Sequence, residues 1–243
     1  MKRFLGGVVA GILAAGLAVA GEAPHWGYEG HEGPAHWAEL SPEFWACGKG
    51  KNQSPVDLRG FIEADLAPLE ISYAEAPLAV VNNGHTIQVN YPAGSTLTVD
   101  GRTFVLKQFH FHAPSENTVE GRSFPLEAHF VHADDQGNLA VLALLFEQGA
   151  ENPELAKIWA HMPASAGGQA TPEGVSVRAD ALLPASRDYY RYNGSLTTPP
   201  CTEGVLWLVL ETPATVSAEQ VEAFRHVMHH DNNRPVQPLN ARA

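Results

Sequence analysis

Three histidines in two short runs carry the clearest chemical signal in the sequence. His110 and His112 lie in the run QFHFH at 108–112, and His129 lies in EAHFV at 127–131. Polar and apolar residues alternate in both runs, which is typical of a β-strand with one face in the core. The connection at 113–128 is polar and rich in turn-forming residues, so the second strand can lie antiparallel beside the first. The three imidazoles can then converge on one point.

Three nitrogen ligands with an open fourth position are typical of a catalytic zinc ion. Gln108 and Glu127 each precede a histidine by two residues on the same strand face, where a hydrogen bond to the imidazole would orient it. The chain has only two cysteines, which excludes a thiolate-rich structural zinc site. We therefore expect one zinc ion per chain, bound by His110, His112 and His129. The alternative is that these are ordinary strand histidines, hydrogen-bonded in the core or at the surface.

The first twenty residues have the pattern of a secretory signal peptide. Lys2 and Arg3 precede an apolar run that is rich in Gly and Ala and ends in Ala18-Val19-Ala20, so cleavage is expected after Ala20. A membrane anchor is the alternative, but the run is short for that purpose. We expect residues 1–20 to be removed and residues 21–243 to form one exported domain, periplasmic or secreted, without a membrane contact after cleavage.

Charge and cysteine content narrow the function further. The formal net charge is −12, and no cluster of Lys and Arg offsets it, so nucleic-acid binding is disfavoured. The two cysteines are Cys47 and Cys201. In an exported protein an isolated pair favours a disulfide bond. A catalytic thiol is the alternative, and it would need a basic partner nearby. Cys47 sits among Trp45, Ala46 and Gly48, and Cys201 follows two prolines, so the disulfide is favoured.

The pattern of the remaining chain predicts a mostly β protein with a few peripheral helices, of the α+β class. Gly and Pro are spread evenly, as in chains of short strands joined by turns. Strands are expected at 79–81, 86–90, 95–99, 103–111, 126–132, 139–147 and 205–212, of which the last two are continuously apolar like central strands. Helices are expected at 153–161 and at 217–229, where Ser217 and Gln220 form a capping box. The stretch at 24–54 is expected to be irregular and held to the body by Trp26, Trp37 and Trp45.

These runs, together with other motifs, resemble the α-class carbonic anhydrases of the bacterial, secreted type over roughly residues 25–239. The motifs that carry the resemblance are HWGY at 25–28, GPAHW at 33–37, NQSPV at 52–56, NGH at 83–85, QFHFH at 108–112, SENT at 115–118, EAH at 127–129, YNGSLTTPPCTE at 192–203 and NRPVQP at 233–238. Ala113 and Asn233 replace tryptophans of animal members, which points to the bacterial type. The resemblance implies a large, twisted, mainly antiparallel central sheet with zinc at the bottom of a conical cleft.

The resemblance also implies the reaction, which is the reversible hydration of CO₂ to bicarbonate and a proton by attack of a zinc-bound hydroxide. Thr197 would accept a hydrogen bond from that hydroxide and donate its own proton to Glu116, and Thr198 would border the bicarbonate site. His85 would carry the released proton to buffer, which suits a group that titrates near neutral pH. Tyr28 and Asn83 would order the waters of this proton relay.

Other roles follow from the same resemblance. Gln108 would orient His110, Glu127 would orient His129, and a main-chain carbonyl near Asn232 would hold His112. The apolar wall of the CO₂ site would consist of Val131, Val141, Leu196 and Trp207. Cys47 and Cys201 match the disulfide of secreted members, and a homodimer is expected by analogy alone.

Two other functions fit the same fold. One is a non-catalytic binding or adhesion module, but family members of that kind have typically lost a zinc ligand, whereas this chain keeps all three. The other is a zinc hydrolase that acts mainly on esters, and here the small apolar site argues against large substrates. CO₂ and bicarbonate are therefore the expected ligands.

Overall fold

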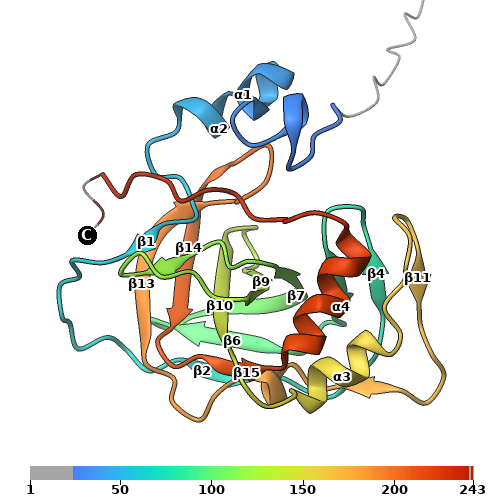
Figure 1. The fold of residues 1–243 in the computed structure, drawn as a ribbon. Helices are drawn as coiled ribbons and strands as arrows, with labels where there is room; N and C mark the ends of the chain where they lie inside the picture. Colours follow the sequence, from blue (N-terminus) through green and yellow to red (C-terminus); the bar gives the residue numbers. More distant parts are fainter. Residues whose placement is uncertain (1–23, 241, 243) are drawn as a thin grey trace, which may run out of the picture.

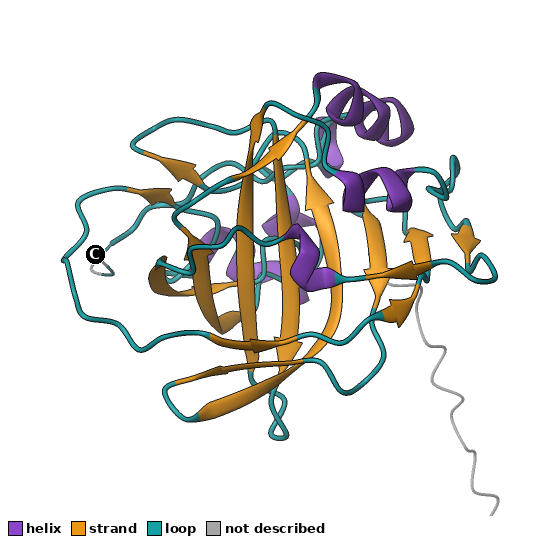
Figure 2. Cartoon of the chain, turned by 90° about the horizontal axis from the view of Figure 1, so that it is seen from below, coloured by secondary structure: helices purple, strands orange, loops and turns teal. Residues whose placement is uncertain are grey.

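The computed structural model describes residues 24–240 and 242 of the chain, so the expected signal peptide at 1–20 lies outside the described residues. Its centre is a large twisted sheet (Figures 1 and 2) with the strand order β11-β4-β5-β7-β9-β10-β14-β13, to which β2, β6 and β15 are added at the side. Neighbouring strands are antiparallel, except that β10 pairs in parallel with β14 and β15. The expected mostly β fold with a mainly antiparallel central sheet is confirmed.

The strands of the main sheet reproduce most of the expected segments. Its members are β2 (Glu70–Ser72), β4 (Val80–Asn82), β5 (Ile87–Asn90), β6 (Thr96–Val99), β7 (Arg102–His112), β9 (Leu126–Ala133), β10 (Leu139–Gln148), β11 (Gln169–Ala170), β13 (Tyr189–Ser195), β14 (Glu203–Leu210) and β15 (Ala214–Val216). The sequence did not predict β2, β11, β13 or β15. As expected, β10 and β14 are buried along most of their length, because they lie in the middle of the sheet. Two further pairs stand apart from the main sheet: β1 (Asp57–Leu58) with β8 (Thr118–Val119), and β3 (Ala76–Pro77) with β12 (Ser176–Val177).

The strand that carries two of the histidines contains an irregularity that sequence alternation does not reveal. The pairing of β7 with β9 shifts register between Leu106 and Gln108. On either side of this bulge, Leu106 and Phe109 both belong to the main hydrophobic core. One extra residue in a strand exchanges its two faces. The bulge therefore keeps the aromatic residues of β7 in the core while Gln108 and the two histidines point to the opposite side.

Helices cover only part of the sheet. α3 (Pro153–Trp159) and α4 (Ala218–Met228) lie side by side (Figure 1), with the Trp159 ring stacked 5.8 Å from that of Phe224. Ser217 caps α4 in the expected capping box with Gln220. Among the described residues, no helix combines the length and apolarity needed to cross a bilayer.

The N-terminal stretch is more ordered than expected. It contains the short helices α1 (Trp37–Leu40) and α2 (Trp45–Lys49) and two 3-10 turns, Gly30–Glu32 and Pro42–Phe44. Trp37 is fully buried beneath the guanidinium of Arg234, and Trp26 stacks on His85, so these two residues do hold the stretch to the body. The same expectation for Trp45 was wrong, because its side chain is 60% exposed on α2. The sequence of a five-residue helix is too short to show whether a single aromatic side chain faces the core or the solvent.

Candidate metal centre

The three histidines meet on one face of the central sheet. His110 on β7 lies directly opposite His129 on the antiparallel strand β9, and His112 is two residues further along β7. One nitrogen of each ring lies within 4.8 Å of the corresponding nitrogens of the other two. It is the one cluster of three or more potential metal ligands among the described residues. The expected convergence of the imidazoles is confirmed.

Each imidazole is held by a hydrogen bond on the side away from the centre. His110 Nδ1 lies 2.8 Å from Gln108 Oε1, and His129 Nε2 lies 2.9 Å from Glu127 Oε1. His112 Nδ1 lies 2.7 Å from the main-chain oxygen of Asn232. All three partners accept a hydrogen bond, so each contacted ring nitrogen is the one that carries the proton. The lone pairs of His110 Nε2, His112 Nε2 and His129 Nδ1 then face one another.

This donor set fits a zinc ion. The His112 side chain is buried, yet its Nε2 atom has no hydrogen-bond partner in the described part of the chain. A buried polar atom without a partner is costly, and a metal ion would satisfy it. Burial is the main cause that lowers the pKa of all three histidines, and for His110 and His129 the lowering is large. Neutral imidazole is the form that binds metal, and three of them with an open position suit catalytic zinc.

Two buried carboxylates adjoin the histidines: Glu127 on the side away from the centre, and Glu116 next to the nitrogens of His112 and His129 that face the centre. Besides the bond to His129, Glu127 accepts hydrogen bonds from the main-chain amides of Glu116 and Asn117 and from the Asn117 side chain. Glu116 Oε1 accepts a bond of 2.8 Å from the Arg234 main-chain amide, and its Oε2 lies 3.5 Å from His112 Nε2. Burial raises the pKa of Glu116 to about 8, against the lowering effect of the Arg234 amide and of the Thr197 side chain. A bound cation would lower this pKa in turn.

The loop after β13 brings Thr197 to the centre, and Thr198 follows it in the chain. The Thr197 side chain is buried and lies close enough to Glu116 to lower its pKa. The loop is closed by a main-chain bond of 2.8 Å from Cys201 N to Thr198 O. Cys201 forms a disulfide with Cys47, as expected from the sequence. The disulfide therefore ties this loop to the N-terminal stretch.

An apolar surface adjoins the histidines on the strands next to β9. Val141 on β10 lies in register with Val131 on β9 and with Trp207 on β14. The Trp207 ring stands edge-on to the His129 ring at 4.9 Å. Leu196 packs against the same cluster. The four apolar residues expected to form one wall are thus brought together, beside the metal ligands.

His85 lies in the turn between β4 and β5, and its ring stacks on that of Trp26 with 3.8 Å between centroids. Partial burial lowers the pKa of His85, and repulsion by His25 and His230 adds to the effect. Tyr28 lies near enough to Glu116 for the charge of that carboxylate to raise the tyrosine pKa, although burial is the larger cause. Asn83 Oδ1 accepts the main-chain amides of His85 and Thr86 within their shared turn.

Sequence reasoning missed two buried polar side chains at the centre. The Asn232 side chain is fully buried and hydrogen-bonds to the main chain on both sides of His112. The guanidinium of Arg234 donates to the main-chain oxygens of Ser54 and Cys47 and to the Gln53 side chain. The motif NRPVQP contains Arg234, but a motif does not say which way an arginine points.

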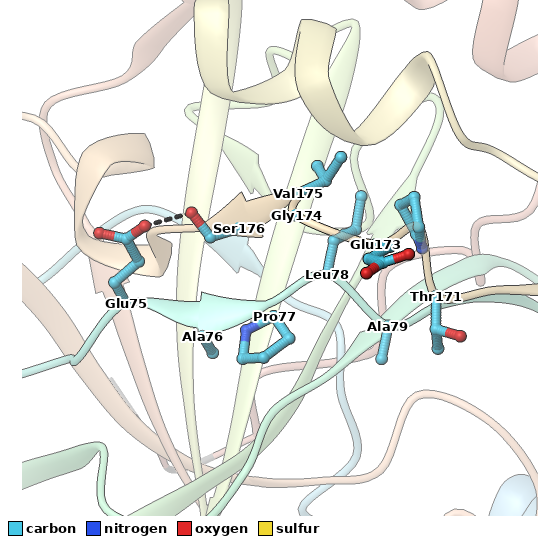
Figure 3. Close-up of a pocket in the computed structure, with 11 residues that line it drawn as sticks. Glu75, Ala76, Pro77, Leu78, Ala79, Thr171, Glu173, Gly174, Val175 and Ser176 are labelled. Atoms are coloured by element: carbon cyan, nitrogen blue, oxygen red, sulfur yellow. Dashed lines mark hydrogen bonds between the residues drawn. The ribbon is translucent and has the colours of Figure 1, made fainter.

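A separate pocket lies outside this centre, beside the β3–β12 pair (Figure 3). Its lining is mainly apolar and main-chain, with Glu75 hydrogen-bonded to Ser176 at one end. None of the residues expected in the functional site lines this pocket.

Comparison with known proteins agrees with this geometry. Residues 32–243 match the family model described as eukaryotic-type carbonic anhydrase. A carbonic anhydrase of Pectobacterium carotovorum is 54% identical over 225 residues, which cover 93% of this chain and 92% of that protein. The α-carbonic anhydrase of Thermovibrio ammonificans, solved with the inhibitor sulfanilamide, superposes with a TM-score of 0.87 at 54% identity, covering 91% of this chain and 98% of that one. The α-carbonic anhydrase of Photobacterium profundum gives a TM-score of 0.85 at 50% identity, covering 90% and 98%.

Proposed function

The chain belongs to the α-class carbonic anhydrase family, and we propose specific roles for its residues in the reversible hydration of CO₂. The observation that carries the proposal is the convergence of three imidazole nitrogens within 4.8 Å, each ring held from behind by an acceptor. In this enzyme His110, His112 and His129 form the zinc site. A zinc ion bound there would act as a Lewis acid and lower the pKa of a water molecule to about 7, a value established on this enzyme class.

In our proposal Thr197 and Glu116 orient the attacking water. Glu116 is fixed by the Arg234 amide and faces the Thr197 side chain. If the Thr197 hydroxyl donates its proton to Glu116, its oxygen can only accept a hydrogen bond from the attacking water. The remaining lone pair of that water then points toward the apolar wall, where CO₂ would lie. Thr198, on the same loop, would contact the bicarbonate product.

The apolar wall suits a substrate that offers weak hydrogen-bonding groups. Val131, Val141 and Trp207 are direct neighbours on three adjacent strands, and Leu196 packs against them. An apolar surface beside a polar centre would hold CO₂ without fixing it through strong bonds and would release the charged product. The same wall leaves little room for the acyl group of a large ester.

A proton must leave the centre in each turnover, and we assign its transfer to His85. An imidazole can accept and release a proton near neutral pH. His85 is partly exposed and stacks on Trp26, which in turn contacts Tyr28. Tyr28, and Asn83 through its amide nitrogen, would order the waters that bridge the gap.

Kinetics of CO₂ hydration on a stopped-flow instrument test these roles. Replacing His85 with Ala should lower kcat in dilute buffer at least about tenfold and leave kcat/KM unchanged, because the proton leaves after CO₂ has reacted. Added imidazole should restore kcat. His226→Ala, at an exposed position of α4, is the control and should match the wild type. An unchanged kcat in the His85 variant would remove His85 from the mechanism.

We also propose that residues 1–20 are a signal peptide and that the enzyme acts in the periplasm or outside the cell. The Cys47–Cys201 disulfide supports export, because such bonds persist outside the reducing cytosol. Cell fractionation with N-terminal sequencing of the purified protein would test both points, and a mature protein starting at Met1 would contradict them. A homodimer is proposed by analogy alone, and light scattering of the purified protein would decide it.

A further inference from the structure

The turn that carries His85 is attached to the metal-binding strand by side chains and not by the sheet alone. The ladder between β5 and β7 pairs Gln88 with His110 as its last partners on the side of the metal centre. Beyond this pair the chain of β5 leads back through Thr86 to His85. Inside the turn, Asn83 accepts the amides of His85 and Thr86, which gives the turn its shape but does not connect it to β7.

Two buried side chains make that connection at a single residue, Phe111, which lies between two of the metal ligands. The Thr86 hydroxyl donates to Phe111 O at 2.5 Å and accepts from Phe111 N at 3.2 Å. The Asn232 side-chain amide donates to the same Phe111 O at 2.9 Å and to His85 O at 3.0 Å. Both side chains are almost inaccessible to solvent, so water does not compete for these bonds.

The Asn232 side chain uses all of its donors in this way. Its two N–H groups go to His85 and Phe111, while its Oδ1 accepts from Ala113 N at 2.9 Å. Its main-chain oxygen accepts the bond from His112 Nδ1. One residue thus contacts the His85 turn, the strand between two ligands and one ligand itself. Leucine has a similar size and shape but could make none of the side-chain bonds.

We propose that the Asn232 side chain, together with the Thr86 hydroxyl, is a positioning device that fixes the His85 turn against the main chain of Phe111 and so sets the geometry of proton transfer from the metal centre. This inference rests on the role proposed above for His85. Transfer through bridging water depends steeply on distance and direction, and a displacement of about 1 Å can slow a reaction by about 100-fold. Asn232 and Thr86 are positioning residues, since neither side chain reaches the reacting atoms.

The test compares zinc-loaded Asn232→Leu and Thr86→Val with the wild type. Both changes keep charge and approximate volume and remove the bonds to the His85 turn or to Phe111, and Asn232→Leu also removes the acceptor of the Ala113 amide. In dilute buffer kcat should fall about tenfold in both variants, and imidazole should restore it. In Thr86→Val, whose side chain bonds to no metal ligand, kcat/KM should stay within about twofold. Asn152→Leu is the matched control, because Asn152 is also buried and hydrogen-bonded but caps α3, away from the site. Thr86→Ser keeps the hydroxyl and should retain wild-type kcat.

A second readout does not depend on activity. An NMR titration of the His85 ring in the same zinc-loaded proteins measures its pKa, which in the wild type lies below its ordinary value because of burial and repulsion by His25 and His230. If the turn is released, this pKa should rise toward about 6.5 in Asn232→Leu and Thr86→Val and stay unchanged in Asn152→Leu.

Each outcome decides the proposal. An equal fall of kcat and kcat/KM in Thr86→Val would overturn it, since the bonds to Phe111 would then support only the metal centre. Unchanged kcat in both variants would also overturn it. If Asn232→Leu does not fold, Thr86→Val decides the question alone. If His85→Ala has no effect on kcat, the role proposed for His85 in proton transfer is wrong. The attachment of the His85 turn is a separate claim, which the NMR titration tests by itself.

Discussion

Glu127→Gln is the substitution whose effect follows most directly from the hydrogen bonds of the metal centre. Glu127 Oε1 accepts from His129 Nε2 at 2.9 Å and from Asn117 Nδ2 at 2.7 Å. Its Oε2 accepts from the main-chain amides of Glu116 at 2.7 Å and Asn117 at 2.8 Å. All four partners are donors. A glutamine must place its own NH₂ group where one of these oxygens was, so two donors lose their acceptor in either orientation of the amide.

The expected magnitude follows from this count. A buried donor left without a partner costs about 1–3 kcal/mol, so the zinc-free variant should lose about 2–6 kcal/mol of unfolding free energy. If the NH₂ group faces His129, the imidazole loses the acceptor that fixes its tautomer. Loss of such a partner lowers metal affinity by about 10- to 100-fold, or about 1.4–2.7 kcal/mol.

Two measurements check this expectation. Urea unfolding of the zinc-free protein reports the lost hydrogen bonds, and competition with a chelator of known affinity reports zinc binding. Glu147→Gln is the control, because Glu147 is partly exposed and paired with Arg122 at 2.8 Å, and an exposed pair contributes at most about 1 kcal/mol. Glu127→Gln with zinc affinity within threefold of the wild type and unchanged unfolding would refute the reasoning.

Three further predictions concern other parts of the molecule. The buried His132 accepts a hydrogen bond from the Tyr73 hydroxyl at 2.7 Å, and burial lowers its pKa to about 4. Because the unfolded chain takes up the proton at a higher pH than the folded protein, the free energy of unfolding should fall by about 3 kcal/mol as pH drops from 7 to 4. Urea titrations of His132→Gln should lack this fall. Reduction of the Cys47–Cys201 bond, which joins residues 154 apart, should lower unfolding free energy by at most about 5 kcal/mol, measured with and without reductant; no change would show that the bond is not formed in solution. Val141→Tyr should fill the apolar wall and lower kcat/KM by about tenfold or more while zinc content by metal analysis stays at one per chain; full activity would move the CO₂ site elsewhere.

The parts of the centre that local alternation encodes were predictable from the sequence. Polar and apolar residues alternate in the runs around His110 and His129, and the structure places them on neighbouring antiparallel strands with the expected faces. The capping box of Ser217 and Gln220 is local in the same sense, because it depends on residues three apart. Such features depend on a few adjacent residues, and the tertiary contacts of this protein favour the same local structure.

Features that depend on distant partners were not predictable. β13 has no clear alternation in its sequence and is a strand because it pairs with β14. The bulge in β7 exists only relative to β9. Alternation places His132 on the core face with Phe130, but nothing nearby in the sequence indicates that its partner there is Tyr73. The importance of Asn232 arises where three separate segments meet, and no spacing along the chain indicates that meeting point.

The hydrogen bonds of the centre predict how the protein behaves without zinc. The three rings are held by Gln108, Glu127 and the Asn232 main chain, so their positions do not depend on a metal. Three buried side-chain atoms of the described residues lack a hydrogen-bond partner: His112 Nε2, Glu116 Oε2 and Arg225 Nε. The first two lie 3.5 Å apart at the metal centre. Removal of zinc should therefore leave the fold and the ring positions in place and should abolish CO₂ hydration until zinc is restored. Amide NMR spectra of stripped and reloaded protein would show this as shifts confined to β7, β9 and the loop at 196–202. Shifts spread through α3 and α4 would instead mean that the metal, and not these hydrogen bonds, organises the centre.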